Sequence, residues 1–377
     1  MKKFHPFIGF VCILWGAAVA IGQENCWVDP CDPCGGAPAS PFTFGGWVEM
    51  GVYTNSHGSR DNGPMHTDSN RRTDFLMNQL YFYGEKELNT RRGFDWGARA
   101  DLVYGVDAGT KQTFGDETFD FNWGTNRHGY GMSAYQLYGT LGYKELSVKA
   151  GKFYTPCGWE GSASLDNFFY SHSYCYWVEA ATNMGVVADY NLTDRLTLSA
   201  GWVTGEDSSF KNPNGNNAVL TGFTYALADN ATVYYNFNGG RQYHDSVDYF
   251  VQSLCFEWAM TKRFTYVMQY NLRNDNERGG DGRYSTYGIN NHFLYKLNDR
   301  WRAGMRVEWL RDNAGYIQEG ASGDYYQLTW GLNWNPCKNL SVRPEVRYDR
   351  SRGGASPFAD GTRKEQISGG CAVVVSF

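Results

Sequence analysis

Two stretches decide the fold: residues 301–309, WRAGMRVEW, and residues 340–349, LSVRPEVRYD. In both, apolar side chains occupy every second position, and charged or small residues fill the positions between them. Side chains of a β-strand alternate between two faces with a period of two, whereas a helix repeats every 3.6 residues. Each stretch is therefore predicted to be a strand with one apolar face and one charged face.

The same pattern recurs along most of the chain. The segments that show this pattern have lengths near the 9–11 residues that a tilted strand needs to cross the hydrocarbon core of a bilayer. The pattern predicts sixteen strands, at 42–54, 75–88, 94–106, 133–143, 145–154, 183–192, 195–204, 217–227, 230–238, 247–259, 262–272, 285–297, 300–311, 324–335, 339–349 and 365–377.

The connections between these strands alternate between short and long. Outer-membrane barrels sort their connections in this way, with short periplasmic turns, long external loops and an even number of strands. A strand in lipid must also pair on both sides, so the sheet has to close on itself. We therefore expect an all-β fold: a transmembrane antiparallel up-and-down β-barrel of about 16 strands formed by residues 42–377.

The composition agrees with a barrel and excludes other classes. Aromatic residues make up 17% of the 377 residues, charged residues 19%, and the net charge is −5. Abundant aromatics with a small net charge argue against disorder, and a chain that is not basic is no candidate for nucleic-acid binding. The mean hydropathy of −0.52 excludes a bundle of transmembrane helices. A low mean hydropathy is expected of a barrel, because half of the side chains of each strand face water.

The N-terminus predicts export. A basic start and an apolar stretch end near Gly22, so residues 1–22 are predicted to be a signal peptide. Residues 23–41 form a Cys-, Pro- and Gly-rich segment that we expect in the periplasm. The spacing of Cys26, Cys31 and Cys34 resembles a metal site, but an oxidising compartment disfavours thiolate ligands, so no metal or other cofactor is predicted and the role of these cysteines stays open.

The inner face of the barrel carries the candidate pore residues. Four arginines, at 302, 306, 343 and 347, lie on the predicted strands 300–311 and 339–349. Two interpretations stay open: the arginines select small polar or anionic solutes, or they brace the wall. The predicted pore-lining residues are Arg99, Asp101, Lys149, Asp189, Arg302, Arg306, Glu308, Arg343, Glu345 and Arg347.

The connection 155–182 is long and rich in aromatic residues, so it should be buried. We expect it to fold into the barrel and narrow the pore; a position over the rim or at a subunit contact is the alternative. A Cys157–Cys175 disulfide would stabilise a loop of this size by about 3 kcal/mol, although free thiols remain an alternative. The predicted constriction residues are Glu160, Asp166, Asn167, Tyr170, Ser171 and His172.

The chain resembles the bacterial putative beta-barrel porin-2 family of outer-membrane proteins from about residue 47 to its end. The resemblance is most specific over residues 149–204, in Gly151-Lys152-Phe153, in the stretch 167–174 (NFFYSHSY) and in 192–198 (LTDRLTL). Residues 177–183 and the cysteine-rich stretch 26–34 depart from the family pattern. The resemblance implies a passive channel and does not imply a substrate.

These observations predict a porin in the outer membrane of a Gram-negative-type bacterium, passing small hydrophilic solutes or ions. The C-terminal Phe377 resembles the signal that barrel-insertion machinery reads, outer-membrane lipid surrounds the wall, and a homotrimer is left open. The alternatives are a closed structural or adhesion barrel and a soluble secreted β-protein. Catalysis is not predicted, because the neighbouring His57, Ser59 and Asp61 do not by themselves make a nucleophile, base and oxyanion site.

Overall fold

The computed structural model describes residues 40–64, 67, 71–113, 123–210, 212, 215–242, 246–277 and 283–377. The predicted signal peptide and nearly all of the segment 23–41, with its three cysteines, lie outside the described residues. Within the described ranges, no helix is long and apolar enough to cross a bilayer.

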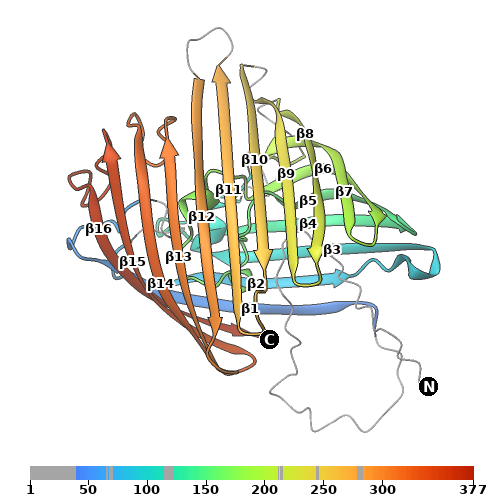
Figure 1. Ribbon diagram of the computed structural model, residues 1–377, viewed down its shortest axis with the longest axis horizontal. Coiled ribbons are helices and arrows are strands. Elements are labelled where there is room, and N and C mark those ends of the chain that lie inside the picture. Colours follow the sequence, from blue (N-terminus) through green and yellow to red (C-terminus); the bar gives the residue numbers. More distant parts are fainter. Residues whose placement is uncertain are drawn as a thin grey trace.

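Sixteen antiparallel strands form one closed barrel, in which each strand pairs with its neighbours in sequence and β1 pairs with β16 (Figure 1). This confirms the predicted fold. The strands are β1 (Thr43–Asn55), β2 (Leu76–Lys86), β3 (Phe94–Gly105), β4 (Gly131–Tyr143), β5 (Leu146–Tyr154), β6 (Thr182–Thr193), β7 (Leu196–Glu206), β8 (Asn217–Ala228), β9 (Ala231–Gln242), β10 (Val247–Trp258), β11 (Phe264–Glu277), β12 (Arg283–Lys296), β13 (Trp301–Asp312), β14 (Gly323–Cys337), β15 (Leu340–Gly353) and β16 (Glu365–Ser376).

The barrel closes at the C-terminus. Beyond the ladder between β1 and β16, the backbones of Gly46 and Phe377 exchange two hydrogen bonds, of 3.0 and 2.9 Å. The ring of Phe377 lies 5.6 Å from that of Phe82 on β2, measured between centroids. The last residue of the chain is thus part of the seam between the first and last strands.

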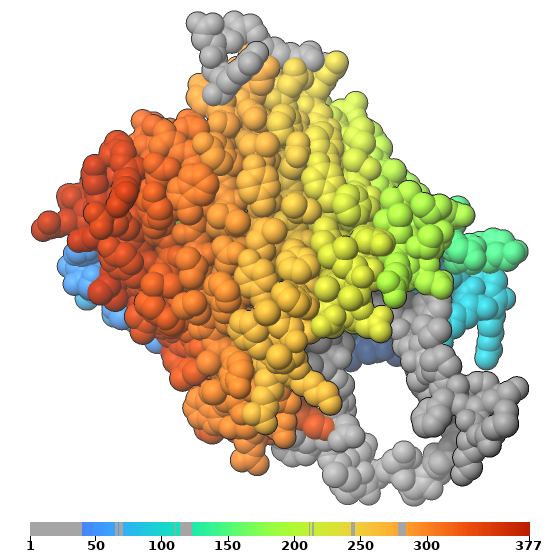
Figure 2. All heavy atoms as spheres, in the orientation of Figure 1, coloured from blue at the N-terminus to red at the C-terminus, as the bar shows by residue number. Residues whose placement is uncertain are grey.

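The strand register separates a lipid face from an inner face, as the alternation predicts. On β13, Arg306 and Glu308 are buried while Val307 between them is exposed. Exposed aromatic side chains gather near the ends of strands, where Trp301 and Trp334 stack on neighbouring strands, as in the aromatic girdles of membrane barrels. Figure 2 shows side chains of adjacent strands packed into a continuous outer surface.

Three external connections are shorter than predicted, because the strand before each one runs four or five residues further. β9 runs to Gln242 rather than to residue 238, β11 runs to Glu277 rather than to residue 272, and β15 runs to Gly353 rather than to residue 349. The added residues are mainly polar and glycine. Strand ends that pass beyond the membrane have water on both faces, so the alternation that marks a strand fades while the backbone ladder continues.

Short helices lie in the connections: η1 (Thr90–Arg92), α1 (Val106–Thr110), η3 (Ser164–Asp166) and α2 (Tyr174–Trp177). The last two belong to residues 155–181, between β5 and β6. We name this segment the inner loop. Its residues bond to side chains of β2, β10, β11, β13 and β15, which come from several sides of the barrel. The prediction that this connection folds into the barrel is confirmed.

Candidate functional site

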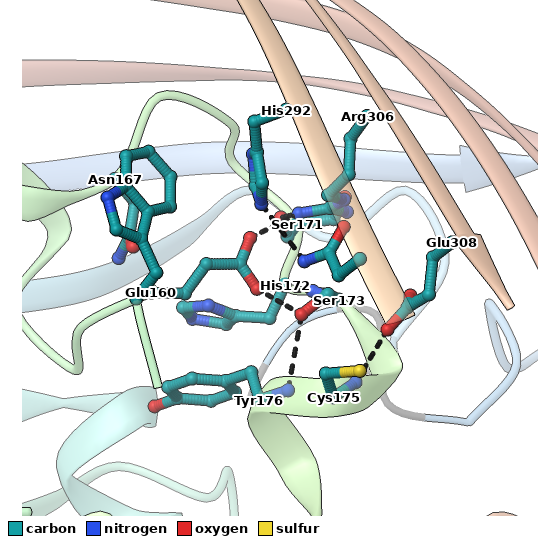
Figure 3. Close-up of polar contacts among 12 residues, drawn as sticks. Glu160, Asn167, Ser171, His172, Ser173, Cys175, Tyr176, His292, Arg306 and Glu308 are labelled. Atoms are coloured by element: carbon teal, nitrogen blue, oxygen red, sulfur yellow. Dashed lines mark hydrogen bonds and ion pairs between the residues drawn. The ribbon is translucent and has the colours of Figure 1, made fainter. Parts of the chain in front are cut away.

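A buried ion pair fixes the inner loop to the wall at β13. The Arg306 guanidinium donates to the Glu160 carboxylate at 2.5 Å and to the Ser171 carbonyl at 2.7 Å (Figure 3). Glu160 in turn accepts from the backbone N–H of Ser173 at 2.8 Å and from its hydroxyl. A charged, multiply bonded pair of this kind is strong as long as both partners are present.

Glu308, two residues further along β13, holds the N-terminus of α2. Its two carboxylate oxygens accept from the backbone N–H groups of Tyr174 and Cys175, at 2.8 and 2.6 Å. The first N–H groups of a helix have no partner within the helix, and they attract negative charge. A wall carboxylate therefore takes the place that an N-cap would have, and Ser173 completes the cap by accepting from Tyr176 N–H.

Strand β15 binds the same stretch of loop backbone. Glu345 accepts from the N–H groups of Tyr170 and Ser171, at 2.8 and 3.2 Å. Arg347 donates to the carbonyl of His172 at 2.6 Å, and Asp349 holds the same guanidinium at 2.8 Å. Residues that are far apart in sequence thus satisfy successive backbone groups of the loop.

Arg343 fixes the beginning of this stretch. Its guanidinium donates to the carbonyls of Ser164 and Asn167, at 2.8 and 2.9 Å, and pairs with Glu49 on β1. Asn167 also braces the loop from within, because its amide donates to the Gly161 carbonyl at 2.7 Å. The loop and the wall of β1, β13 and β15 therefore form one buried polar network.

Glycines on the wall make room for the aromatic side chains of the loop. A Cβ on Gly304 of β13 would lie 2.4 Å from the Phe168 ring, and one on Gly331 of β14 would lie 3.0 Å from the Phe169 ring. A methyl group at Gly304 is incompatible with this packing. Further along, Tyr170 donates from its hydroxyl to Asn78 at 2.9 Å, and the His172 ring stacks on Tyr176 with 3.9 Å between centroids.

The structure divides the predicted pore-lining residues into two groups. Arg306, Glu308, Arg343, Glu345 and Arg347 project inward but lie between the wall and the inner loop, so they bind the loop instead of facing open lumen. The sequence analysis considered that these arginines select solutes or brace the wall, and neither interpretation included a contact with the inner loop.

The other five lie away from that contact. Arg99 pairs with Asp101 at 2.9 Å and with Glu85 at 3.0 Å. Asp189 accepts from the Ser199 hydroxyl at 2.5 Å, and Lys149 lies over the ring of Tyr138. Arg302, near the short-turn end of β13, is half-buried and makes no hydrogen bond or ion pair within the described residues.

The predicted disulfide is not formed, because Cys157 and Cys175 are both free thiols. Cys175 is held in α2 by Glu308. Cys157 lies instead between Pro156, whose carbonyl accepts from Asn236, and Gly158, whose N–H donates to Ser253. These bonds place Cys157 against β9 and β10, so sequence proximity within the loop was misleading.

The opposite side of the inner loop borders a water-accessible space, which we name the recess. Its empty volume is about 850 Å³, including open solvent. The loop forms one wall, and strands β5, β8 and β9 form the other. The lining residues are Tyr154, Thr155, Pro156, Cys157, Gly158, Trp159, Glu160, Gly161, Ser162, Asp166, Tyr176, Glu179, Ala180, Ala181, Thr224, Tyr234 and Asn236.

Three carboxyl groups of the recess have displaced pKa values. Burial would raise the pKa of Glu160, but the charges of Arg306, His292 and His172 outweigh it and lower the pKa to about 2. For Asp166 burial dominates and raises the pKa to about 7. Burial also dominates for Glu179 and raises its pKa to about 8.

Two features of the site escaped the sequence analysis. Glu179 was not singled out, although a lone carboxylate among the residues WVEAAT could have marked it. Helix α1 also escaped notice; its Asp107 accepts from the side chains of Asn78 and Gln79, at 3.1 and 2.8 Å, and packs a second short helix against the wall. Within the described residues, no three His, Cys, Asp or Glu side chains gather as they would around a metal ion.

Three solved outer-membrane proteins illustrate what the chain resembles. An anion-selective porin from Comamonas acidovorans aligns with a TM-score of 0.60 and 10% identity, over 89% of this chain and 99% of that chain. The outer membrane channel DcaP of Acinetobacter baumannii gives 0.58 and 11%, over 89% and 97%. The trimer form of OmpT from Vibrio cholerae gives 0.55 and 10%, over 89% and 99%. At these identities the likeness shows the fold alone.

Comparison of the sequence with protein-family models identifies the family. A search of curated proteins finds no match. A family model described as "Putative beta-barrel porin-2, OmpL-like" matches residues 41–377, which include the whole barrel and the inner loop. With a closed sixteen-stranded barrel, this places the protein in the Gram-negative outer membrane as a porin, and the chain belongs to the putative beta-barrel porin-2, OmpL-like family.

Proposed function

We propose that small hydrophilic solutes or ions diffuse passively through the recess, between the inner loop and the wall of β5, β8 and β9. One observation carries this proposal: the loop leaves a water-accessible space beside the wall of β5, β8 and β9. On the side of β1, β13 and β15 the loop backbone is held by buried charges. Beside β5, β8 and β9, where Asn236 donates to the Pro156 carbonyl, a space of about 850 Å³ remains, including open solvent. A sixteen-stranded barrel is wide enough to leave such a channel.

The residues that line the recess favour polar solutes of modest size. Hydroxyl and amide side chains come from Thr155, Ser162, Tyr234 and Asn236. Such groups can replace part of a solute's hydration shell without binding it tightly. The recess is therefore suited to the passage of a solute rather than to its tight binding.

Conductance in planar bilayers tests the proposal. Purified protein should form open channels, and deletion of residues 160–172 should raise their single-channel conductance, because the deletion removes the docked part of the loop. Protein that inserts and folds but forms no channels would favour a closed structural or adhesion barrel. A deletion variant of unchanged conductance would show that the loop is not the constriction.

Three further parts of the assignment are proposals. Outer-membrane lipid is the expected partner of the outer face, and the insertion machinery is the expected partner of Phe377, which lies at the seam where β1 meets the end of the chain. A homotrimer is supported by the trimer form of OmpT among the similar structures. Chemical crosslinking of the protein in outer-membrane vesicles would detect three copies.

We also infer that the chain is not an enzyme. The His57 ring bonds to the Glu365 carbonyl, and the Ser59 hydroxyl bonds to Asn55 and to the Asp61 carbonyl, so no base activates this serine. In the inner loop, the Ser173 hydroxyl donates to Glu160, which Arg306 keeps ionised.

A further inference from the structure

The charges that line the recess all have one sign. Glu160, Asp166 and Glu179 line it, and none of its lining residues is Lys, Arg or His. Arg306 neutralises Glu160 at 2.5 Å. The other two carboxylates have no cation within ion-pair distance among the described residues, so they decide the charge that a passing solute meets.

Asp166 is a part-exposed carboxylate at the end of η3. No hydrogen bond or ion pair within the described part of the chain holds its oxygens. The charged groups that act on it are Arg99 and Asp101, both on β3. Arg99 is already bonded to Asp101 and to Glu85, so it is not free to neutralise Asp166.

Glu179 is bonded only by neutral donors. Its Oε1 accepts from the Asn271 amide at 2.6 Å and from the Gln269 amide at 3.2 Å, both on β11. The charged groups that act on it, Glu160 and Glu206, carry the same sign as Glu179 itself. Amides orient a carboxylate without cancelling its charge, so Glu179 keeps a full negative charge when ionised.

The wall around this side of the lumen does not reverse that sign. Arg99 and Lys149 act among four carboxylates, at Glu85, Asp101, Asp189 and Glu257. Arg273 pairs with Glu206 and Asp275, the buried Lys152 donates to the Ala134 carbonyl, and Lys111 lies over the ring of Tyr176. Glu257 accepts from Tyr234 and Trp159, both of which line the recess. The arginines that could have favoured anions, at 306, 343 and 347, are buried under the loop.

We propose that Asp166 and Glu179 make this channel selective for small cations over anions. The inference rests on the proposed function, since it assigns a solute charge to the same passage. Carboxylates in a narrow, water-filled passage raise the local concentration of cations and exclude anions. The suitable solutes are inorganic cations and small organic ammonium ions.

The test is the reversal potential of single channels in a KCl gradient at pH 9, where both carboxyl groups are ionised. Wild type should prefer K⁺. Asp166→Asn and Glu179→Gln should each lower the K⁺/Cl⁻ permeability ratio about threefold, from Coulomb's law in water at roughly 6 Å with screening near 0.1 M salt. Asp194→Asn, which removes the same charge from an exposed turn, should leave the ratio unchanged.

The titration of wild type gives a second, independent measurement. Burial raises the pKa of Asp166 to about 7 and that of Glu179 to about 8, so both should become neutral between pH 9 and pH 5. The permeability ratio should then fall about tenfold, the product of the two single effects. Glu179→Gln should remove the step centred near pH 8 and leave the step centred near pH 7.

The outcomes separate this inference from the proposed function. If no channels form, both are wrong. If channels form but prefer Cl⁻, or if the double variant keeps the wild-type ratio, only the cation inference is wrong. If the double variant does not assemble, the pH titration of wild type decides, and a ratio that is constant from pH 9 to pH 5 would overturn the inference.

Discussion

Replacing Arg306 with methionine should release the inner loop while leaving the barrel closed. The Arg306 side chain has 0% exposure and serves Glu160, the Ser171 carbonyl, the Ser171 hydroxyl and Gln327, at 2.5, 2.7, 3.1 and 3.0 Å. Methionine keeps much of the side-chain volume but removes every donor. The Glu160 carboxylate would then stay buried without a cation.

Two routes give the magnitude. Removing one partner of a buried ion pair costs about 3–5 kcal/mol. Lowering the pKa of Glu160 from 4.5 to about 2 corresponds to roughly 3 kcal/mol of preferential stabilisation of its ionised form. The Ser173 bonds to Glu160 survive, so the lower end applies. A change of about 3 kcal/mol shifts the ratio of docked to undocked loop roughly a hundredfold.

Limited proteolysis of the folded protein measures this ratio. Cleavage within residues 155–181 follows the population of the undocked loop when docking is fast relative to cleavage. Cleavage of Arg306→Met should be about a hundredfold faster than that of wild type, and its channels should be wider and noisier. Arg302→Met is the matched control, because Arg302 lies on the same face of the same strand and bonds to nothing in the described residues. Equal cleavage of the two variants would refute the proposed anchoring.

Three shorter predictions follow from the same contacts. The pKa of Glu160 in the folded protein lies near 2, so Glu160 stabilises the docked loop above pH 4.5 and should lose that effect as the pH falls toward 2. An acid-active protease should therefore cleave the loop faster at pH 2 than at pH 4. Cleavage that does not depend on pH would contradict this. Gly304→Val should displace Phe168, because a Cβ at Gly304 would lie 2.4 Å from the Phe168 ring. The substitution should destabilise the docked loop by about 1–3 kcal/mol, measured by Trp fluorescence during denaturation. Ala303→Val, on the lipid-facing side, is the control, and equal effects of the two substitutions would refute the proposed contact between Gly304 and Phe168. Deletion of Phe377 removes both seam hydrogen bonds to Gly46 and should lower the amount of folded barrel in outer-membrane fractions; an undiminished amount would show that the seam closes without it.

The barrel was predictable because its determinant is local. Lipid on one face and water on the other impose a period of two on each strand separately, so residues such as Val307 and Arg306 reveal their faces without knowledge of any partner. The strand ends of β9, β11 and β15 were missed where water wets both faces and the period carries no information.

The inner loop was predictable in position but not in its contacts. Aromatic residues such as Phe168 and Phe169 required burial, and the barrel interior was available for it. The partner of Glu160 was not predictable, because Arg306 is 146 residues away and any inward arginine was an equal candidate. The Cys157–Cys175 pairing was wrong for the same reason: a contact inside the loop was assumed where the wall provides the neighbours.

The sequence also concealed how the inward charges are distributed once the loop is in place. One interpretation of the arginines was that they select small polar or anionic solutes. Those at 306, 343 and 347, however, are bonded to loop backbone or to carboxylates and are buried. What a solute meets is decided by the charges left over after the loop has docked, chiefly Asp166 and Glu179. Docking therefore does more than narrow the barrel: by covering the cations of one wall, it sets the sign of the charge along the other. It follows that releasing the loop with Arg306→Met should weaken cation preference as well as widen the channel, since the same movement uncovers Arg343 and Arg347.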